Sequence, residues 1–400
     1  MKVLHVIDRM DPEQGGVCQA VRTIATGLLA LGVTNNIVSL DPKDASFLAT
    51  DALSIHALGP AENPWCYSKR LLPWLQEHAT AFDVILVHGL WQYPSYAVYK
   101  TLAKLKSAPR LFVMPHGMLD PYFQRAAGRQ LKAIRNVLYW ALIEKQVVNS
   151  ANGLLFTCAA ERDLARVPFK PYQPKRELVV GLGVEAPPAY TPAMTTAFQT
   201  KCPELQGSPY ILFLSRIHEK KGVDLLLQAY ARLLNARSAS GAGIETCPKL
   251  VIAGPGLETP YGKKIGDMLN QNSLLKDQVY FPGMLKGKAK WGGFYGCEAF
   301  ILPSHQENFG IAVVEALACS KPVLISNQVN IWTEIAQAGG GMVDADTEAG
   351  THSMLHGFIQ MPASERAAMA SNARACFEQY FAVGPATAKL FAAITSQKDV

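Results

Sequence analysis

Short runs of apolar residues recur along the chain, and each ends in a turn or a polar residue. The runs that predict strands are Val3–Ile7, Val84–His88, Leu111–Met114, Leu154–Thr157, Tyr210–Ser215, Leu250–Ala253, Ala299–Leu302 and Val323–Ser326. Runs that are apolar at every position are typical of strands buried on both faces, as in parallel sheets. Segments with helical periodicity lie between them: Ala20–Ala30, Leu131–Val148, Val223–Leu234, Ile311–Ala318 and Ser364–Tyr380. This alternation predicts an α/β fold of doubly wound domains.

The length and the prolines indicate two domains. A chain of 400 residues is too long for one core and suits two domains of roughly 150–200 residues each. Four prolines lie in Glu185–Gly207, and a new apolar run starts just after this segment. We therefore expect a linker there, with one domain over residues 1–190 and another over residues 208–380. The Ala-, Gly- and Ser-rich segment Ala236–Gly243 predicts a flexible surface loop.

Composition narrows the class of protein. Charged residues make up 18% of the chain and the formal net charge is +6, a surplus too small to indicate a nucleic-acid-binding protein. The eight cysteines are scattered without a C-x-x-C pair, so we expect reduced thiols and no zinc site. The first apolar run is too short for a signal peptide, and no stretch approaches the ~18 apolar residues of a membrane span. We expect a cytoplasmic protein that is soluble or lies peripherally on the inner face of the membrane.

In open parallel sheets, ligands bind beyond the carboxyl ends of the strands, so residues that follow a strand are candidates for chemistry. Gly15 and Gly16 follow the first strand and precede a helix, where backbone N–H groups can approach an anion. Taken alone, the pair is better explained by an ordinary strand-to-helix turn. Gly254-Pro-Gly256 lacks the third glycine of a dinucleotide fingerprint, which speaks against an oxidoreductase.

Two cations, Arg216 and Lys221, follow the strand Tyr210–Ser215. An arginine grips a pyrophosphate with a fork of N–H donors, and a lysine adds a compact positive charge. We interpret both as candidate phosphate ligands. Lys220 is better explained as part of a solvated turn next to Glu219.

Glu307 lies in the loop after the strand Ala299–Leu302, and Glu315 lies on the apolar helix Ile311–Ala318. A carboxylate buried in such a helix needs hydrogen-bond donors, because an unpaired buried charge is costly. The vicinal hydroxyls of a ribose would supply them, and the helix N-terminus at Gly310–Val313 would face phosphates. The alternative is a salt bridge from Glu315 to another helix.

His116 follows the strand Leu111–Met114 and precedes a glycine, a position that suits a hydrogen-bond donor facing the substrate. His88 is placed similarly, with a weaker signal. Asp344 and Asp346 form a D-x-D triplet, whose carboxylates could hold a divalent ion. Because the triplet lies far along the chain after a run of glycines, we interpret it as a polar turn and predict no metal site.

The segment Arg125–Lys145 predicts a basic amphipathic helix. One face is apolar and another is cationic, through Leu131, Ile134, Leu138 and Leu142 and through Arg125, Arg129 and Lys132. Such a helix can lie on an anionic membrane. We expect the more ordinary arrangement, in which the apolar face packs into the core, with membrane contact as the alternative.

With these motifs the chain resembles the retaining glycosyltransferase family 4, also called group 1 glycosyltransferases, of the GT-B fold. The motifs follow the family's order over most of the chain: Gly15-Gly16, Pro115–Asp120, Ser215-Arg-Ile…Lys221-Gly222, Val251–Gly256 and Glu307-x7-Glu315. The resemblance implies two Rossmann-like domains that face each other across a cleft. It also implies that a last helix, at about residues 380–400, packs back on the N-terminal, acceptor-side domain.

The resemblance implies residue roles as well. The catalytic set would be His116 beside the donor sugar and acceptor, Arg216 and Lys221 on the diphosphate, and Glu307 on the donor sugar. The remaining donor-binding positions would be Gly15, Gly16, Gly254, Gly256, Met284, Leu285, Asn308, Phe309, Gly310, Ile311 and Glu315. No metal or cofactor is expected, because cations and a helix N-terminus supply the positive charge.

Such an enzyme would transfer a hexosyl group from a UDP- or GDP-linked sugar, with retention of configuration, to a glycan or lipid-linked acceptor. The sequence Met118-Leu-Asp-Pro121 resembles a subgroup that serves bacterial surface-polysaccharide assembly. Aromatic residues in Asn63–Lys69 and Leu90–Tyr96 could stack on acceptor sugars. Two alternatives stay open: a nucleotide-sugar 2-epimerase of the same fold, which needs no acceptor, and a non-catalytic nucleotide-sugar binder.

Overall fold

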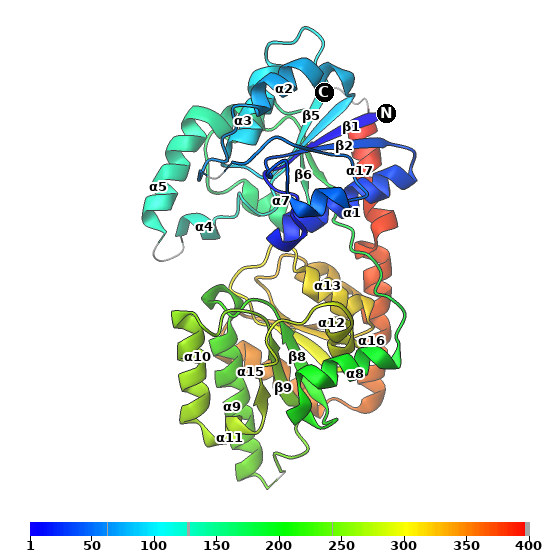
Figure 1. Ribbon diagram of the computed structural model, residues 1–400. Helices are drawn as coiled ribbons and strands as arrows, with labels where there is room; N and C mark the ends of the chain where they lie inside the picture. The colour runs from blue at the N-terminus through cyan, green and yellow to red at the C-terminus, as the bar shows by residue number, and fades with distance from the viewer. Residues whose placement is uncertain (62, 126–128, 242, 397–400) are drawn as a thin grey trace. The chain divides into compact units, whose positions relative to one another are not determined.

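The chain divides into two compact units. The computed structural model describes residues 1–61, 63–125, 129–241 and 243–396. Unit 1 runs from Met1 to Glu185 and resumes at Ala382, and unit 2 comprises Ala186–Phe381. Each unit has a parallel sheet flanked by helices, so the predicted α/β class is confirmed (Figure 1).

Unit 1 is built on a parallel sheet whose strand order, among the described residues, is β3-β2-β1-β4-β5-β6-β7. The strands are β1 (Lys2–Val6), β2 (Thr34–Ser39), β3 (Ile55–Ala57), β4 (Val84–His88), β5 (Arg110–Met114), β6 (Gly153–Phe156) and β7 (Glu177–Val179). β4 is buried at every position, as expected of a central strand covered on both faces. The chain order reverses between β1 and β4, and the carboxyl ends of these two strands mark the switch point where such sheets bind ligands.

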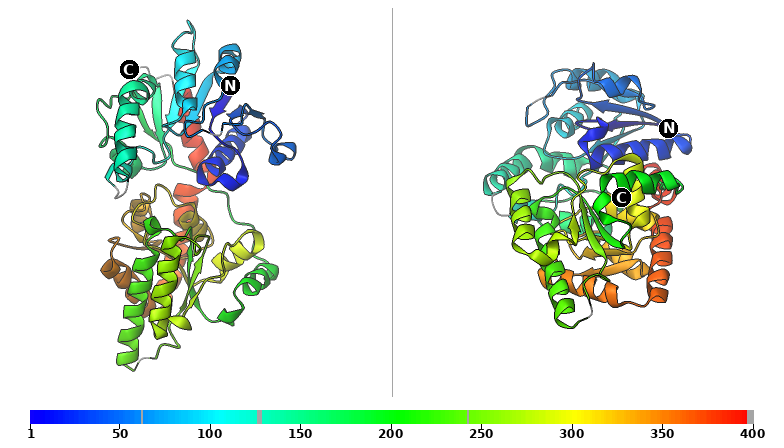
Figure 2. Two further views of the ribbon diagram at one scale, coloured as in Figure 1. Left: turned by 60° about the vertical axis from the view of Figure 1, so that its left-hand side comes forward. Right: turned by 60° about the horizontal axis from the view of Figure 1, so that its bottom comes forward.

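The helices of unit 1 are α1 (Gly16–Ala30), α2 (Leu71–His78), α3 (Tyr93–Leu102), α4 (Tyr122–Arg125), α5 (Gln130–Tyr139), α6 (Lys145–Ser150), α7 (Ala159–Ala165) and α17 (Val383–Thr395). A π-helical turn, Trp140–Glu144, joins α5 to α6. α17 lies beside α1, although the two are far apart in the sequence (Figures 1 and 2). Gly27 of α1 permits this approach, because a Cβ there would overlap the side chain of Thr387.

Unit 2 has a second parallel sheet, with the order β10-β9-β8-β11-β12-β13 among the described residues. Its strands are β8 (Tyr210–Leu214), β9 (Lys249–Ala253), β10 (Val279–Tyr280), β11 (Ala299–Leu302), β12 (Val323–Ser326) and β13 (Gly341–Asp344). Its helices are α8 (Pro192–Lys201), α9 (Val223–Ala239), α10 (Pro260–Gln271), α11 (Ser273–Lys276), α12 (Gly287–Gly296), α13 (Ile311–Ala318), α14 (Trp332–Ala338), α15 (Glu348–Gln360) and α16 (Ala363–Cys376), which a π-helical turn, Phe377–Phe381, follows. α9 packs against α15, and α12 packs against α8. The switch point of this sheet lies between β8 and β11.

Two segments differ from the prediction. Glu185–Gly207 is more than a linker, because α8 lies within it and packs against α12. Pro192 suits the start of this helix, since the first N–H groups of a helix have no intrahelical partner. Unit 2 therefore begins at Ala186 rather than at residue 208. The predicted loop Ala236–Gly243 is partly helical, because α9 extends to Ala239, and residue 242 of that loop lies outside the described residues.

Candidate active site

The sheet of unit 2 brings Lys221 and Glu307 together at its switch point. β8 and β11 are neighbours in the sheet, and the two residues follow these strands. The Lys221 ammonium donates a hydrogen bond to the Glu307 carboxylate. The two side chains are only 8% and 19% exposed. A largely buried ion pair at the carboxyl edge of a parallel sheet lies where this kind of fold binds ligands.

The loop after β8 packs tightly against the loop after β11. Gly222 has a φ of 66°, and a Cβ there would overlap the carbonyl oxygen of Pro303. The carbonyl of Lys220 accepts a hydrogen bond of 2.8 Å from Ser304 Oγ. Since only a glycine fits this approach and this φ, Gly222 fixes the position of Lys221.

Glu307 is held by the segment that follows β12. Its N–H donates to the carbonyl of Gln328 and its carbonyl accepts from the N–H of Asn330, both at 2.9 Å. The backbone of Glu307 is therefore fixed on both sides. A carboxylate has about four lone-pair sites, so Glu307 can accept hydrogen bonds from a ligand while it is paired with Lys221.

Arg216 supplies a second cation in the loop after β8. It is exposed, and its guanidinium makes no hydrogen bond or ion pair with any residue that the structure describes. An arginine without a partner among the described residues, in the same loop as a lysine, suits the binding of a diphosphate.

Gly254 and Gly256 bring the loop after β9 against the loop that carries Arg216. Their φ angles are 145° and 119°, and Cβ atoms there would overlap the carbonyl oxygens of Ser215 and Ile217. The N–H of Ile217 also donates to the Pro255 carbonyl at 2.8 Å. These two glycines therefore have a packing role that their predicted contact with the donor does not require.

The turn before α13 combines buried and accessible groups. Gly310 has a φ of 76° and caps the helix, and Ile311 begins it and is partly exposed. Phe309 is 4% exposed and packs edge-on against Phe381, with ring centres 5.7 Å apart. Its backbone alone could meet a ligand. Asn308 is partly exposed, so its side chain could reach one.

Met284 and Leu285, which were predicted to bind the donor, differ in exposure. Met284 is 52% exposed, whereas Leu285 is 5% exposed. Of the two side chains, only that of Met284 is available to a ligand.

Glu315 is paired with Lys290 of α12. The ammonium donates to Oε1 at 2.7 Å, and the side chains are 24% and 14% exposed for Lys290 and Glu315. This is the salt bridge to another helix that the sequence leaves open as an alternative. The ammonium also lies 4.2 Å from the centre of the Trp291 ring. A contact between Glu315 and ribose hydroxyls stays a prediction.

In unit 1, His116 ends a column of three histidines from neighbouring strands. Nδ1 of His5 lies 3.0 Å from Nε2 of His88, and Nδ1 of His88 lies 3.1 Å from Nε2 of His116. Burial lowers the pKa of His5 and of His116 to about 4, and it lowers the pKa of His88 well below its usual value. All three are therefore neutral at pH 7.

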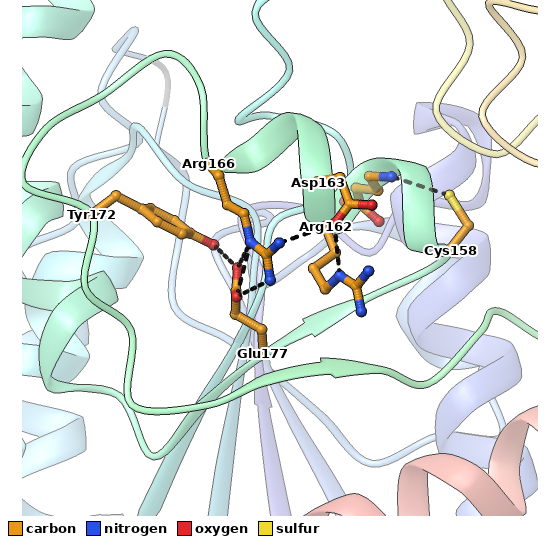
Figure 3. A network of polar contacts seen from close by, with 7 residues as sticks. Cys158, Arg162, Asp163, Arg166, Tyr172 and Glu177 are labelled. Carbon is orange, nitrogen blue, oxygen red and sulfur yellow. Dashed lines mark hydrogen bonds and ion pairs between the residues drawn. The ribbon is translucent and has the colours of Figure 1, made fainter.

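The turn that carries His116 is anchored by Glu161 of α7. His116 has a φ of 52°, which a residue with a Cβ rarely adopts. Oε1 of the buried Glu161 accepts a 2.6 Å hydrogen bond from the N–H of Gly117. α7 is tied in turn to the edge strand β7, where Arg166 pairs with Glu177 at 2.6 Å (Figure 3). Glu161 thus supports the site, although nothing near it in the sequence points to that role.

Gly15 and Gly16 lie at the N-terminus of α1, and Gly15 has a φ of 107° with open space beside it. A cavity of about 580 Å³ lies within unit 1, lined by Arg9, Asp11, Asp41 and other residues that follow β1, β2 and β3. Its volume suits a small polar molecule.

Asp344 and Asp346 have other partners. Asp344 ends β13 rather than lying in a turn, and its Oδ1 accepts from the N–H of Ala345 at 2.7 Å. Asp346 pairs with Nδ1 of His305 at 2.9 Å. In the part of the chain that the structure describes, no group of three or more His, Cys, Asp or Glu side chains is arranged to hold a metal ion.

The expected packing of the basic amphipathic helix is wrong. The α5 face, defined as Leu131, Ile134, Leu138 and Leu142, is 58–84% exposed instead of buried in the core. The opposite side of the helix, with Asn136 and Trp140, is the buried one. Residues 126–128 of the predicted segment lie outside the described residues. No helix among the described residues is both long and apolar enough to cross a membrane.

Two family models match the chain. One, described as Glycosyl transferases group 1, matches residues 196–375, and the other, described as a Glycosyl transferase 4-like domain, matches residues 15–183. The chain belongs to the group 1 glycosyltransferases. It is 29% identical over 260 residues to a D-inositol 3-phosphate glycosyltransferase of Geodermatophilus obscurus. The matched residues make up 64% of this chain and 52% of the relative. The chain therefore spans about half the length of the curated relatives that it matches.

Solved structures share the fold of this family member. Anabaena Alr3699/HepE, in complex with UDP and glucose, has a TM-score of 0.73 at 16% identity, over 99% of this chain and 100% of that one. WaaG, a glycosyltransferase involved in lipopolysaccharide biosynthesis, has a TM-score of 0.62 at 15% identity, over 98% and 100% of the two chains. At these identities the likeness establishes the GT-B fold alone.

Proposed function

We propose that this group 1 glycosyltransferase is a retaining enzyme that needs no metal ion. It transfers a hexosyl group from a UDP- or GDP-linked sugar to a glycan or lipid-linked acceptor. The observation that carries the proposal is the Lys221–Glu307 ion pair at the switch point of unit 2, with Arg216 in the same loop as Lys221 and without a side-chain partner among the described residues. Together with the N-terminus of α13, these residues offer the positive charge and the N–H donors that a departing diphosphate needs.

In the proposed reaction, the bond between C1 of the sugar and the diphosphate oxygen breaks while an acceptor hydroxyl attacks C1 from the same face. The hydroxyl proton passes to a phosphate oxygen of the leaving group. The products are the glycosylated acceptor and the nucleoside diphosphate. Arg216 and Lys221 stabilise the negative charge that grows on the diphosphate. Glu307 orients Lys221 and accepts hydrogen bonds from hydroxyls of the sugar.

For the nucleotide of the donor we favour UDP, because Alr3699/HepE has been solved with UDP and with UDP-glucose. For the biological role we propose surface-polysaccharide assembly, which is supported by the Met118–Pro121 sequence and by the description of WaaG. The curated relatives named for D-inositol 3-phosphate make a soluble phosphorylated polyol the acceptor to test beside a lipid-linked one.

The α5 face supports a lipid-linked acceptor. Arg125, Arg129, Lys132 and Arg135 lie in this region, and no acidic residue occurs between Asp120 and Glu144, which are themselves buried. Trp65, which is 41% exposed, lies under the Arg135 guanidinium with 5.6 Å to the ring centre. Exposed apolar residues, an aromatic ring and unopposed cations are typical of a helix that lies in an anionic bilayer surface. We propose that the α5 face inserts into such a surface.

The test of the donor site is calorimetric titration with UDP, GDP and ADP, with and without EDTA. Selective binding of one diphosphate that survives EDTA supports the proposal, and binding that EDTA abolishes overturns the metal-free mechanism. Transfer assays follow, with the anomeric configuration of the product determined by NMR. An inverted product refutes retention. Epimerised donor without any acceptor identifies a 2-epimerase, and binding without turnover identifies a non-catalytic binder.

The test of the α5 face is sedimentation with vesicles of phosphatidylcholine, with and without phosphatidylglycerol. We expect binding that depends on the anionic lipid and that Leu138→Glu weakens. Leu29→Glu is the matched control, because Leu29 is 61% exposed on α1, a helix that lies apart from α5 in unit 1 (Figures 1 and 2). Equal binding by both variants contradicts the proposal. A dimer of the wild type that Leu138→Glu dissociates would assign the face to a second copy of the chain instead.

A further inference from the structure

Asn35 of β2 fixes one end of the histidine column formed by His5, His88 and His116. Its Nδ2 donates to the carbonyls of Ala25 and Val33, at 3.2 and 2.9 Å. Both amide hydrogens are thereby used, and Oδ1 lies 3.1 Å from Nε2 of His5. Since an amide oxygen can only accept, Nε2 of His5 must carry the hydrogen.

This assignment passes along the whole column, because a neutral imidazole has one N–H and one acceptor nitrogen. Nδ1 of His5 accepts from Nε2–H of His88 across 3.0 Å. Nδ1 of His88 then accepts from Nε2–H of His116 across 3.1 Å. Every N–H points toward Asn35. Nδ1 of His116 is the acceptor left over, and it has no hydrogen-bond partner among the residues that the structure describes.

The column keeps this direction only while it is neutral. A proton on Nδ1 of His88 would make that atom a donor and would force His116 to reverse its tautomer. Burial opposes this, because it lowers the pKa of all three imidazoles. His5 is 0% exposed and His88 is 5% exposed, so water cannot easily replace either partner.

We propose that Asn35, His5 and His88 lock His116 as the Nε2–H tautomer, so that its Nδ1 accepts a hydrogen bond from a substrate hydroxyl. His116 is then an acceptor, which reverses the donor role that its position in the sequence suggests. The other three are positioning residues. A proton taken up by His116 could move no further than His5, because the Asn35 amide oxygen does not take it on, so the column orients His116 and does not conduct protons to solvent. The assignment of the tautomer does not depend on the proposed function, whereas the assignment of a substrate hydroxyl as the ligand of Nδ1 rests on the proposed function.

The tautomer can be measured without substrate, by two-bond ¹H–¹⁵N correlation spectra of ¹⁵N-histidine-labelled protein at neutral pH. We expect all three column histidines to carry their hydrogen on Nε2. Asn35→Leu is expected to add the Nδ1–H tautomer at His116. The matched control is Asn36→Leu, the next residue of β2, whose side chain bonds Ser54 Oγ at 3.2 Å instead. A wild-type His116 with its hydrogen on Nδ1, or an Asn35→Leu spectrum equal to that of the control, overturns the proposal.

The hydroxyl ligand is tested by kinetics. Asn35→Leu should raise the KM of the substrate that bears the hydroxyl by roughly 3- to 10-fold, the loss of one neutral hydrogen bond, with a smaller change in kcat. His116→Asn, whose side-chain oxygen can take the place of Nδ1, should retain more activity than His116→Phe. If the tautomer shifts in Asn35→Leu while KM stays at the control value, the hydroxyl contact is refuted. A protein with the expected tautomers but no transferase activity would refute the proposed function and leave the lock standing.

Discussion

Glu144 is a buried carboxylate of which only one oxygen is hydrogen-bonded to the surrounding groups that the structure describes. It is 0% exposed and ends the π-helical turn after α5. Oε1 accepts from the N–H of Trp91 at 2.7 Å and from Ser95 Oγ at 2.8 Å, whereas Oε2 has no hydrogen-bond partner among the described residues. Burial therefore raises the pKa of Glu144 to about 7, although both hydrogen bonds oppose the shift.

The raised pKa sets the direction and size of a pH effect on stability. Between pH 4.5 and about 7 the folded protein holds a proton on Glu144 that the unfolded chain has lost. The contribution of Glu144 to stability is thus complete below pH 4.5 and is lost as the pH rises through 7. At about 1.4 kcal/mol for each pH unit between the two pKa values, the ionised side chain costs about 3 kcal/mol.

Glu144→Gln removes this cost and keeps an oxygen acceptor for Trp91 and Ser95. Above pH 7 we expect the variant to exceed the wild type by about 1–3 kcal/mol in free energy of unfolding, with the lower figure applying if the new amide N–H₂ stays unpaired. Toward acidic pH this advantage should disappear. The assay is urea unfolding at a series of pH values, followed by tryptophan fluorescence, to which unit 1 contributes Trp65, Trp74, Trp91 and Trp140 of the six tryptophans.

The histidines titrate in the wild type and in Glu144→Gln alike, so their contributions cancel in the difference between the two unfolding free energies. A difference in unfolding free energy that stays constant with pH would refute the reasoning, because it would mean that Glu144 is already ionised in the acidic folded protein. Glu144 also bears on function. Trp91 and Ser95, to which it is hydrogen-bonded, belong to the segment Leu90–Tyr96, whose aromatic residues we expect to contact the acceptor, and Glu144 holds the start of that segment to α3.

Three further predictions concern the site and its supports. Lys221→Ala and Glu307→Ala should each lower kcat/KM roughly 100-fold, which corresponds to a loss of about 3 kcal/mol in transition-state stabilisation, with unchanged circular dichroism. Lys220→Ala is the control and should stay near wild type. Full activity of Lys221→Ala or Glu307→Ala would remove that residue from the site. Gly254→Ala should lower the melting temperature, because its Cβ would overlap the Ser215 carbonyl. Gly266 lies in α10 with open space around it, so Gly266→Ala should raise the free energy of unfolding by up to about 1 kcal/mol. A Gly254→Ala variant more stable than Gly266→Ala would contradict the packing argument. As the pH falls from 6.5 to about 4, a proton binds His5 in the unfolded chain but not the buried His5 of the folded protein. Urea unfolding should therefore show that His5 lowers the free energy of unfolding by about 3 kcal/mol over this range, and His5→Gln should abolish this loss. An equal dependence of the unfolding free energy on pH in the variant would count against a neutral His5.

The elements that the sequence predicts are those with a continuous apolar run. β4, β8, β11 and β12 are buried on both faces, and their uninterrupted apolar residues predict this burial. Of the strands that the structure describes, five have no such run and were not predicted: β2, β3, β7, β10 and β13. β3, β7, β10 and β13 are short strands at the edges of the sheets, where burial on both faces is not required. β2 lies inside its sheet but opens with Thr34-Asn35-Asn36, because Asn35 is needed for its polar contacts rather than for apolar packing.

The same distinction applies to the site. The rule that ligands meet the carboxyl ends of parallel strands directs attention to Lys221 and Glu307 from sequence alone, because each residue's distance from its own strand is local information. The pairings are not local, since they depend on strand order. His5 lies inside an apolar run and His88 ends another, 83 residues later, and only the adjacency of β1 and β4 makes them partners. A histidine inside a buried strand nevertheless carries a signal, because a buried imidazole has a donor and an acceptor that both need partners. Such a residue predicts further polar side chains on the neighbouring strands, and in this chain His88 and Asn35 meet that need.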